Sequence, residues 1–202
     1  MELEMFVKSY WNYYLDLEDQ LLLTKRFVDF GKENNNTFSV EYLKLLQATC
    51  SEIDVMAKIM AEEIDTTFKK LERKDIQKWG YVIQNRFPSI ENMSVIFNGD
   101  YSVTPWENWA YEKHIDAKGF IRYKLSKKKK TPAWWTAYNK VKHERTSHYK
   151  HGQANYVRAN LGNLIMALSG LYVLETLYIE HLATCDSDIP VEKSRLFVLD
   201  KK

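Results

Sequence analysis

An apolar stripe near the carboxyl end restricts the fold of this chain more than any other feature of its sequence. From about Gln153 to His181, large apolar residues recur every three or four positions, which places their side chains on one face of a helix. Small residues between them leave room for a neighbouring helix to approach closely. We therefore expect a long last helix at the centre of a helical bundle. Its stripe consists of Val157, Leu161, Leu164, Leu168, Leu171, Leu174 and Tyr178.

The same helical spacing predicts four more helices upstream of this one. Gly31 stands where the C-cap of the first helix belongs, and Ser39 is a good N-cap for the second. Pro132 is well placed at the first turn of the fourth, because proline has no N–H to leave unpaired there. The four helices are expected over residues 6–30, 39–66, 75–86 and 133–143.

Residues 89–130 break the helical pattern. Asn98-Gly99 between two short apolar segments predicts a hairpin with a type I′ turn, and residues 119–123 can add a strand. The tail at 195–199 either pairs with this insertion as a strand or packs over a helix end. The predicted fold is therefore all-α: one domain, 1–202, as an antiparallel four- to five-helix bundle. A small β-hairpin insertion at 89–130 precedes the helix that contains Trp134 and Trp135.

Composition and termini indicate a cytoplasmic protein. Apolar residues make up 45% and charged residues 28%, as in a soluble, helix-rich protein. The amino terminus carries two acids where a signal peptide would carry basic residues. The apolar run 161–174 is interrupted by Asn163 and is shorter than a membrane span, so no membrane partner is expected. Cys50 and Cys185 lie far apart and are expected to be free buried thiols.

The small net charge of +2 conceals a strong asymmetry. Residues 113–158 contain 13 lysines and arginines and two acids, a local charge of +11, so the other 156 residues carry −9. A basic surface on an acidic body is typical of proteins that bind polyanions. The alternative is that the lysine run 127–130 is a solvated loop without a binding role.

Glu52 occupies an unexpected position in the second helix. It lies seven residues from both Leu45 and Ile59, so helical geometry places its carboxylate in the middle of the apolar face. A charged carboxylate left alone in such a place costs several kcal/mol. Glu52 must therefore be paired or protonated.

Chemistry-bearing side chains concentrate between Trp134 and Gly152, which holds three of the five histidines together with Arg145. Histidine exchanges protons near neutral pH, and arginine binds phosphate at any physiological pH. Together they can support RNA cleavage by the 2′-hydroxyl without a metal. A metal site at His143, His148 and His151 is not expected, because no well-placed carboxylate or cysteine joins them. We expect no cofactor.

This combination of long helices, an acid on the core face of the second helix and an Arg/His motif before the last helix resembles the HEPN superfamily. The motif is Arg145-Thr-Ser-His-Tyr-Lys-His151. The resemblance implies a dimer in which two such motifs face one cleft, and a metal-independent endoribonuclease of toxin–antitoxin, abortive-infection or other defence systems. It implies that Arg145 binds phosphate, that His151 is the acid/base catalyst and that Glu52 forms an ion pair with Arg145.

A second alignment places the motif at Tyr138-Asn139-Lys-Val-Lys-His143, with tyrosine in place of the arginine. His143 is then the histidine of the motif, and this alignment implies an inactive protein unless Lys142 or Arg145 substitutes for the missing arginine. Both alignments remain open at this point. The expected nucleic-acid contacts of the basic region are Asn139, Lys142, His148, Lys150, Lys127, Lys128, Lys129 and Lys130.

Three hypotheses about function follow. The first is a metal-independent endoribonuclease, a homodimer that acts on RNA in defence or stress response, with an antitoxin or regulatory protein as a further partner. The second is a noncatalytic HEPN-like module that binds nucleic acid, a nucleotide or a protein. In the third, the basic segment docks on the acidic remainder of a second subunit.

Overall fold

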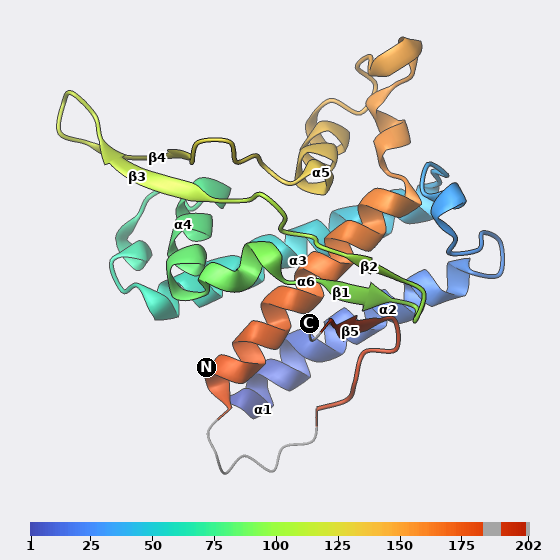
Figure 1. The fold of residues 1–202 in the computed structure, drawn as a ribbon, viewed down its shortest axis with the longest axis horizontal. Helices are drawn as coiled ribbons and strands as arrows, with labels where there is room; N and C mark the ends of the chain where they lie inside the picture. Colours follow the sequence, from blue (N-terminus) through green and yellow to red (C-terminus); the bar gives the residue numbers. More distant parts are fainter. Residues whose placement is uncertain (184–190, 201–202) are drawn as a thin grey trace.

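The computed structural model describes residues 1–183 and 191–200. Its body is built from helices. A three-stranded sheet lies against this body, and a two-stranded ribbon projects from one end (Figure 1). The protein is helix-rich, but the expectation of an all-α fold is wrong. The chain ends its helical pattern at the insertion and at the tail, and both segments add strands that carry core residues such as Phe97 and Phe197.

The first helical segment is shorter than expected. It consists of α1 (Leu3–Phe6), a π-helical turn (Val7–Trp11) and α2 (Asn12–Thr24). After Thr24 the chain turns away from the helix axis, which leaves Phe27 exposed and packs Phe30 against Phe97. Gly31 has a φ of −70° and is no left-handed C-cap. The apolar spacing beyond residue 24 therefore reflects packing of a loop and not a continued helix.

Three other helices are confirmed close to their predicted bounds. They are α3 (Val40–Ile64), α4 (Ile76–Arg86) and α5 (Ala133–His143). Ser39 caps α3, because its Oγ accepts a hydrogen bond from the N–H of Tyr42 at 3.0 Å. Asp75 caps α4 in the same way through the N–H groups of Gln77 and Lys78.

The last helix, α6 (Leu161–Leu182), begins eight residues later than expected. Asn160 caps it by accepting a hydrogen bond from the N–H of Asn163 at 2.9 Å, and short 3₁₀ turns precede it. By length and composition alone, α6 is long and apolar enough to cross a membrane. This corrects the expectation that the apolar segment is shorter than a membrane span. Two thirds of its apolar window, 67%, is buried inside the protein, as in the core helix of a helical body.

The two longest helices, α3 and α6, run parallel to each other. Phe38 and Asn160, which precede them, form a β-bridge, and near their ends the Tyr178 hydroxyl donates a hydrogen bond to Glu63 at 2.7 Å. The first helical segment runs the opposite way, since Phe6 packs against Tyr178. The bundle therefore mixes parallel and antiparallel neighbours, in contrast to the antiparallel bundle expected.

The insertion and the tail together form the small sheet. Strands β1 (Val95–Phe97), β2 (Tyr101–Val103) and β5 (Phe197–Leu199) are antiparallel in the order β2-β1-β5. The predicted turn is confirmed by positive φ values of 52° at Asn98 and 69° at Gly99. Pairing of the tail with the insertion, one of the two alternatives left open, is confirmed as well.

Only one strand of the second hairpin was predicted from the sequence. The strand expected at 119–123 is β4 (Ile121–Leu125), and its partner β3 (Tyr111–Ile115) was missed. These two strands form the projecting ribbon in Figure 1, which packs against α4 at its base. The insertion therefore contributes two hairpins and not one.

Tryptophans tie the insertion to the helical body. The indole N–H of Trp106 donates to the carbonyl of Gly170 on α6 at 3.1 Å, and that of Trp134 donates to the carbonyl of Pro105 at 2.8 Å. Both indoles are buried, together with those of Trp79 and Trp109. Cys50 is free and buried as expected, whereas Cys185 lies outside the described residues.

Candidate nucleic-acid interface

The loop between α5 and α6 contains two of the four predicted catalytic residues, Arg145 and His151, and directly follows a third, His143. Asn155, buried within it, donates a side-chain hydrogen bond to the carbonyl of Glu144 at 2.9 Å, and its own N–H donates to the carbonyl of Ser147 at 2.9 Å. The N–H of Tyr156 donates to the carbonyl of Arg145 at 3.1 Å. The backbone of the loop is thereby held against the end of α5, while the side chains of Glu144, Arg145, His148 and His151 are exposed.

His143, Arg145, His148 and His151 are all exposed. Arg145 donates from Nε to the carbonyl of Val141 at 3.4 Å. Across residues 1–183 and 191–200, no hydrogen bond or ion pair joins any two of these four side chains. These four residues are close together in the sequence and exposed. They lack the base-to-nucleophile contacts that a preformed catalytic site shows.

The expected ion pair between Glu52 and Arg145 is absent. Glu52 is half-buried on α3, where burial raises the pKa of its carboxyl group. Its neighbour is instead Glu175 on α6, whose pKa is raised by burial and, in addition, by the charge of Glu52. Because α3 and α6 run parallel, Glu52 lies beside the middle of α6, and Glu175 is on the order of 20 Å along the helix from its start. Arg145 precedes that start, so the two partners predicted from sequence are at different levels of the body.

The second alignment gains no support from Glu52 either. Lys142 Nζ lies 3.2 Å from the hydroxyl of Tyr138, one turn earlier on α5. The side chain of Asn139 donates to the carbonyl of Trp135 at 3.0 Å, so it is partly occupied within its own helix. Neither Lys142 nor His143 forms an ion pair with Glu52 within the described part of the chain.

The lysine run stands beside the ribbon. Lys127, Lys128 and Lys130 are exposed, whereas Lys129 is half-buried and forms an ion pair with Glu91. Lys150 belongs to the short 3₁₀ turn at residues 150–152 of the other loop. The predicted nucleic-acid contacts thus divide into a group at the ribbon and a group around the end of α5.

A polar cleft lies between the ribbon and α4, and we call it the ribbon cleft. Its volume is about 630 Å³. Tyr81 of α4 and Tyr123 of β4 line it, with ring centroids 5.2 Å apart. Two carboxylates, Asp65 and Asp75, face five basic side chains there. The basic residues that line the ribbon cleft are Lys70, Arg73, Lys78, Lys113 and Arg122.

Only part of this positive charge is compensated. Arg73 pairs with Asp75 at 3.2 Å, and Arg122 pairs with Asp116 at 2.9 Å. A hydrogen bond from Thr67, together with the nearby charge of Lys113, lowers the pKa of Asp65, so this carboxylate is ionised at neutral pH. Lys70 forms no ion pair with any described residue. Five bases against Asp65, Asp75 and the Asp116 that pairs with Arg122 leave an excess of two positive charges, which suits a polyanion.

Three of these bases were missed by the sequence analysis. Lys70, Arg73 and Lys78 precede the basic region at 113–158, and they join it only through the contact between α4 and the ribbon. A signal was present, because residues 69–78 contain five lysines and arginines. Strand β3 was not predicted from the sequence, so the side of the ribbon that faces these bases was not recognised.

A polar cavity of about 450 Å³ lies beside the α5–α6 loop. Arg158 lines it with its guanidinium carbon 3.8 Å from the centroid of the Tyr149 ring, and neither His148 nor His151 of the loop, nor His143 of α5, contributes to its walls. The first N–H groups of α6 are already taken, by the carbonyls of Thr37 and Asn35 at 2.9 Å each. The helix N-terminus therefore offers no free donors to an anion there.

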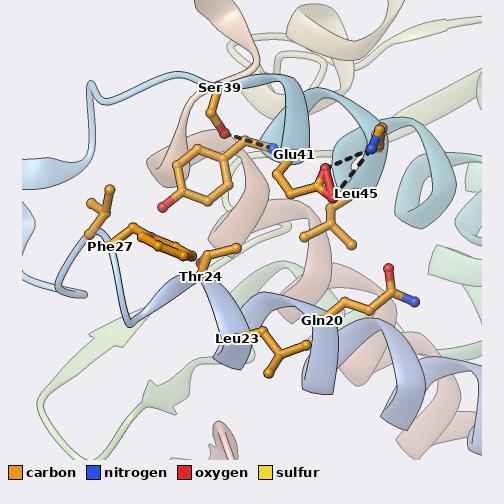
Figure 2. A pocket seen from close by; sticks show the side chains of 10 residues that line it. Gln20, Leu23, Thr24, Phe27, Ser39, Glu41 and Leu45 are labelled. Atoms are coloured by element: carbon orange, nitrogen blue, oxygen red, sulfur yellow. Dashed lines mark hydrogen bonds and ion pairs between the residues drawn. The ribbon is translucent and has the colours of Figure 1, made fainter.

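An apolar pocket of about 370 Å³ lies at the junction of α2 and α3 (Figure 2). Leu23 and Phe27 come from the α2 side, and Glu41 and Leu45 from α3. The Tyr42 hydroxyl, which is buried, has no hydrogen-bond partner among the described residues. This pocket lacks the cluster of bases that distinguishes the ribbon cleft.

Comparisons with protein-family models, with curated proteins and with solved structures find no match to this chain.

Proposed function

We propose that this protein binds RNA through the ribbon cleft and the adjoining lysines 127, 128 and 130, as a noncatalytic module. The observation that carries the proposal is the excess of basic side chains in a cleft that also contains two tyrosines. Lysine and arginine supply the contacts with phosphate, and aromatic rings offer surfaces on which bases stack.

The arrangement of the basic segments supports this proposal. The ribbon, α5 and the α5–α6 loop follow one another along one side of the molecule (Figure 1). The segment of charge +11 therefore forms an extended track, while the acidic remainder of the chain makes up most of the body. A strand of RNA bound at the ribbon cleft can continue along this side, and the acidic body repels it from the others.

Titration of a fluorescent RNA by anisotropy tests the proposal. Wild-type protein is expected to bind with an affinity that falls steeply between about 50 and 200 mM salt. The variant Lys70→Glu/Arg73→Glu/Lys113→Glu reverses three cleft charges and is expected to lose this binding. The matched control Lys8→Glu/Lys25→Glu/Lys44→Glu changes net charge equally at exposed lysines elsewhere and is expected to retain most of it. Equal loss in both variants would show binding governed by net charge alone.

A second candidate is the HEPN-like, metal-independent endoribonuclease. The observation in its favour is that Arg145, His148 and His151 are exposed in one ordered loop that directly follows His143. A single chain has no preformed contacts among these groups. If the protein is a ribonuclease, the substrate or the same loop of a second subunit must complete the catalytic site.

Incubation of RNA with the protein in EDTA tests this second candidate. Cleavage that is lost in Arg145→Ala and His151→Ala supports the first alignment, and cleavage lost in His143→Ala supports the second. Absence of cleavage, with binding retained, leaves the noncatalytic module. The second candidate includes the homodimer, the cytoplasmic location and the antitoxin or regulatory partner. Light scattering of the purified protein tests whether it forms a dimer.

A further inference from the structure

The tip of the ribbon exposes apolar side chains. Ile115 is 71% exposed, Phe120 59% and Ile121 52%, although the base of the same ribbon buries Tyr111 against α4. The ribbon extends away from the body, so nothing in the described structure covers its tip (Figure 1). Exposed apolar groups gathered at the end of a projecting element indicate a contact site.

The turn that presents Phe120 is firmly held. The Asp116 carboxylate accepts hydrogen bonds from the N–H groups of Lys118 and Phe120, at 2.9 Å each. Its second oxygen accepts one from Arg122 Nε, also at 2.9 Å. Gly119 supplies the left-handed backbone, with a φ of 81°. A turn whose backbone is held in place before binding loses little backbone conformational entropy when it contacts a partner.

Basic side chains lie near this apolar tip. Lys124 is paired with Glu112 at 3.1 Å and Arg122 with Asp116, whereas Lys113 and Lys118 form no ion pair with any described residue. Lys113, Lys118 and Lys124 are exposed on the ribbon, and the guanidinium carbon of Arg122 lies 5.8 Å from the centroid of the Phe120 ring. Ile121 and Arg122 also line the ribbon cleft, so the tip and the cleft form one surface. A partner that fits both must combine negative charges with flat apolar faces, and a polynucleotide with accessible bases has this combination.

We propose that Phe120 stacks on an unpaired nucleobase of an RNA strand whose phosphates lie in the ribbon cleft. This inference rests on the proposed RNA binding and specifies its substrate as single-stranded or loop RNA. Bases inside a continuous duplex are already stacked, and the major groove of an A-form helix is too deep and narrow for side chains to read.

Fluorescence of an RNA containing 2-aminopurine measures such stacking directly. Binding of wild-type protein is expected to quench the fluorescence of an unpaired 2-aminopurine. The variant Phe120→Ala is expected to abolish the quenching and to weaken binding of single-stranded RNA roughly 5- to 100-fold, the range for loss of one stacked base. Its salt dependence stays unchanged, because no phosphate contact is removed. Phe120→Tyr, which keeps the aromatic ring, is expected to restore both signals.

Phe27→Ala is the matched control, because Phe27 is 87% exposed and lies in the apolar pocket at α2 and α3. It is expected to bind RNA as wild type does. If Phe120→Ala binds and quenches normally while the triple charge variant of the ribbon cleft loses binding, the stacking inference fails and the proposed function stands. If wild-type protein binds no RNA, both fail.

Two further outcomes would overturn the inference. One is equal affinity for a blunt RNA duplex of the same length, with the same loss in Phe120→Ala. The other is co-sedimentation of wild-type protein with phosphatidylcholine–phosphatidylserine vesicles that is lost in Phe120→Ala, because the tip would then insert into a membrane surface. Co-sedimentation absent in both proteins, together with quenching, supports stacking on RNA.

Discussion

Glu175 of α6 is fully buried beside Glu52 of α3, and neither of its carboxyl oxygens has a hydrogen-bond partner among the described residues. Burial, together with the charge of Glu52, raises the pKa of Glu175 well above its ordinary value of 4.5. Burial alone raises the pKa of Glu52. Two carboxyl groups thus share the interface of the parallel helices, and the fully buried one holds its proton more tightly.

This pair predicts how Glu175→Gln alters stability with pH. An acid whose pKa is raised in the folded state stabilises the fold fully below its unfolded pKa, near 4.5, and this stabilisation is lost as the pH rises through the folded pKa. Glutamine resembles the protonated form at every pH. The variant is expected to have a higher Tm than wild type at about pH 8 and the same Tm at about pH 4.

Thermal unfolding followed by circular dichroism across this pH range measures the difference. Glu180→Gln is the control, since Glu180 is exposed on the same helix and is expected to show no such trend. A gain that is the same at every pH, or a loss at the higher pH, would contradict a protonated Glu175.

Local signals explain which parts of the fold were predictable. Ser39, Asp75 and Pro132 mark the starts of α3, α4 and α5 through contacts within a few residues, and Asn98-Gly99 marks its turn in the same way. The start of α6 was misplaced because apolar spacing continues into a loop that Asn155 holds through hydrogen bonds to distant carbonyls. Nothing local specifies those contacts.

The candidate site was harder to predict for a related reason. Helical periodicity placed Glu52 toward the interior, where it is half-buried, but the HEPN resemblance implied Arg145 as its partner. The neighbour is a second acid, Glu175, whose position depends on the parallel direction of α3 and α6. The ribbon cleft likewise depends on the contact of α4 with strands that begin 25 residues after it ends, at Tyr111.

Glu18 holds the tail against α2. It is fully buried and accepts hydrogen bonds from the hydroxyls of Tyr14 and Ser194 and from the N–H groups of Arg195 and Leu196, the last two at 2.8 and 3.0 Å. Glu18→Ala removes the acceptor of four hydrogen bonds, two of them buried and two part-buried, and is expected to cost about 2–4 kcal/mol. Urea unfolding measures this cost.

Limited proteolysis shows whether Glu18→Ala releases the tail from α2. A released tail is cleaved near residues 194–199 before the helical body is cleaved. Asp16→Ala, at an exposed position of the same helix, is the matched control and is expected to unfold within about 0.5 kcal/mol of wild type. A Glu18→Ala protein as stable as this control would refute the anchoring role.

Gly80 of α4 allows the ribbon to approach the helix. A Cβ at this position would lie 2.7 Å from the Trp109 ring and 2.9 Å from the Tyr111 ring. Alanine favours a helix over glycine by about 1 kcal/mol, yet this overpacking is expected to make Gly80→Ala less stable by about 1–3 kcal/mol. Asn85→Ala, exposed on the same helix, is the control, and chemical denaturation compares the two. A more stable Gly80→Ala protein would show that α4 and the ribbon are not in close contact.

The salt dependence of RNA binding tests the central claim most directly, because it locates the phosphate contacts. Affinity of a single-stranded RNA is measured across a salt series for wild type, for Lys70→Ala/Lys113→Ala at the ribbon cleft, and for Arg145→Ala/His148→Ala in the α5–α6 loop. If the ribbon cleft holds the strand, the slope of log affinity against log salt becomes shallower by about 0.7 for each lost contact in the cleft variant. It changes by less in the loop variant, because the loop contacts only the continuation of the strand. A slope that changes only in the loop variant would contradict the proposal and move the binding site to the loop.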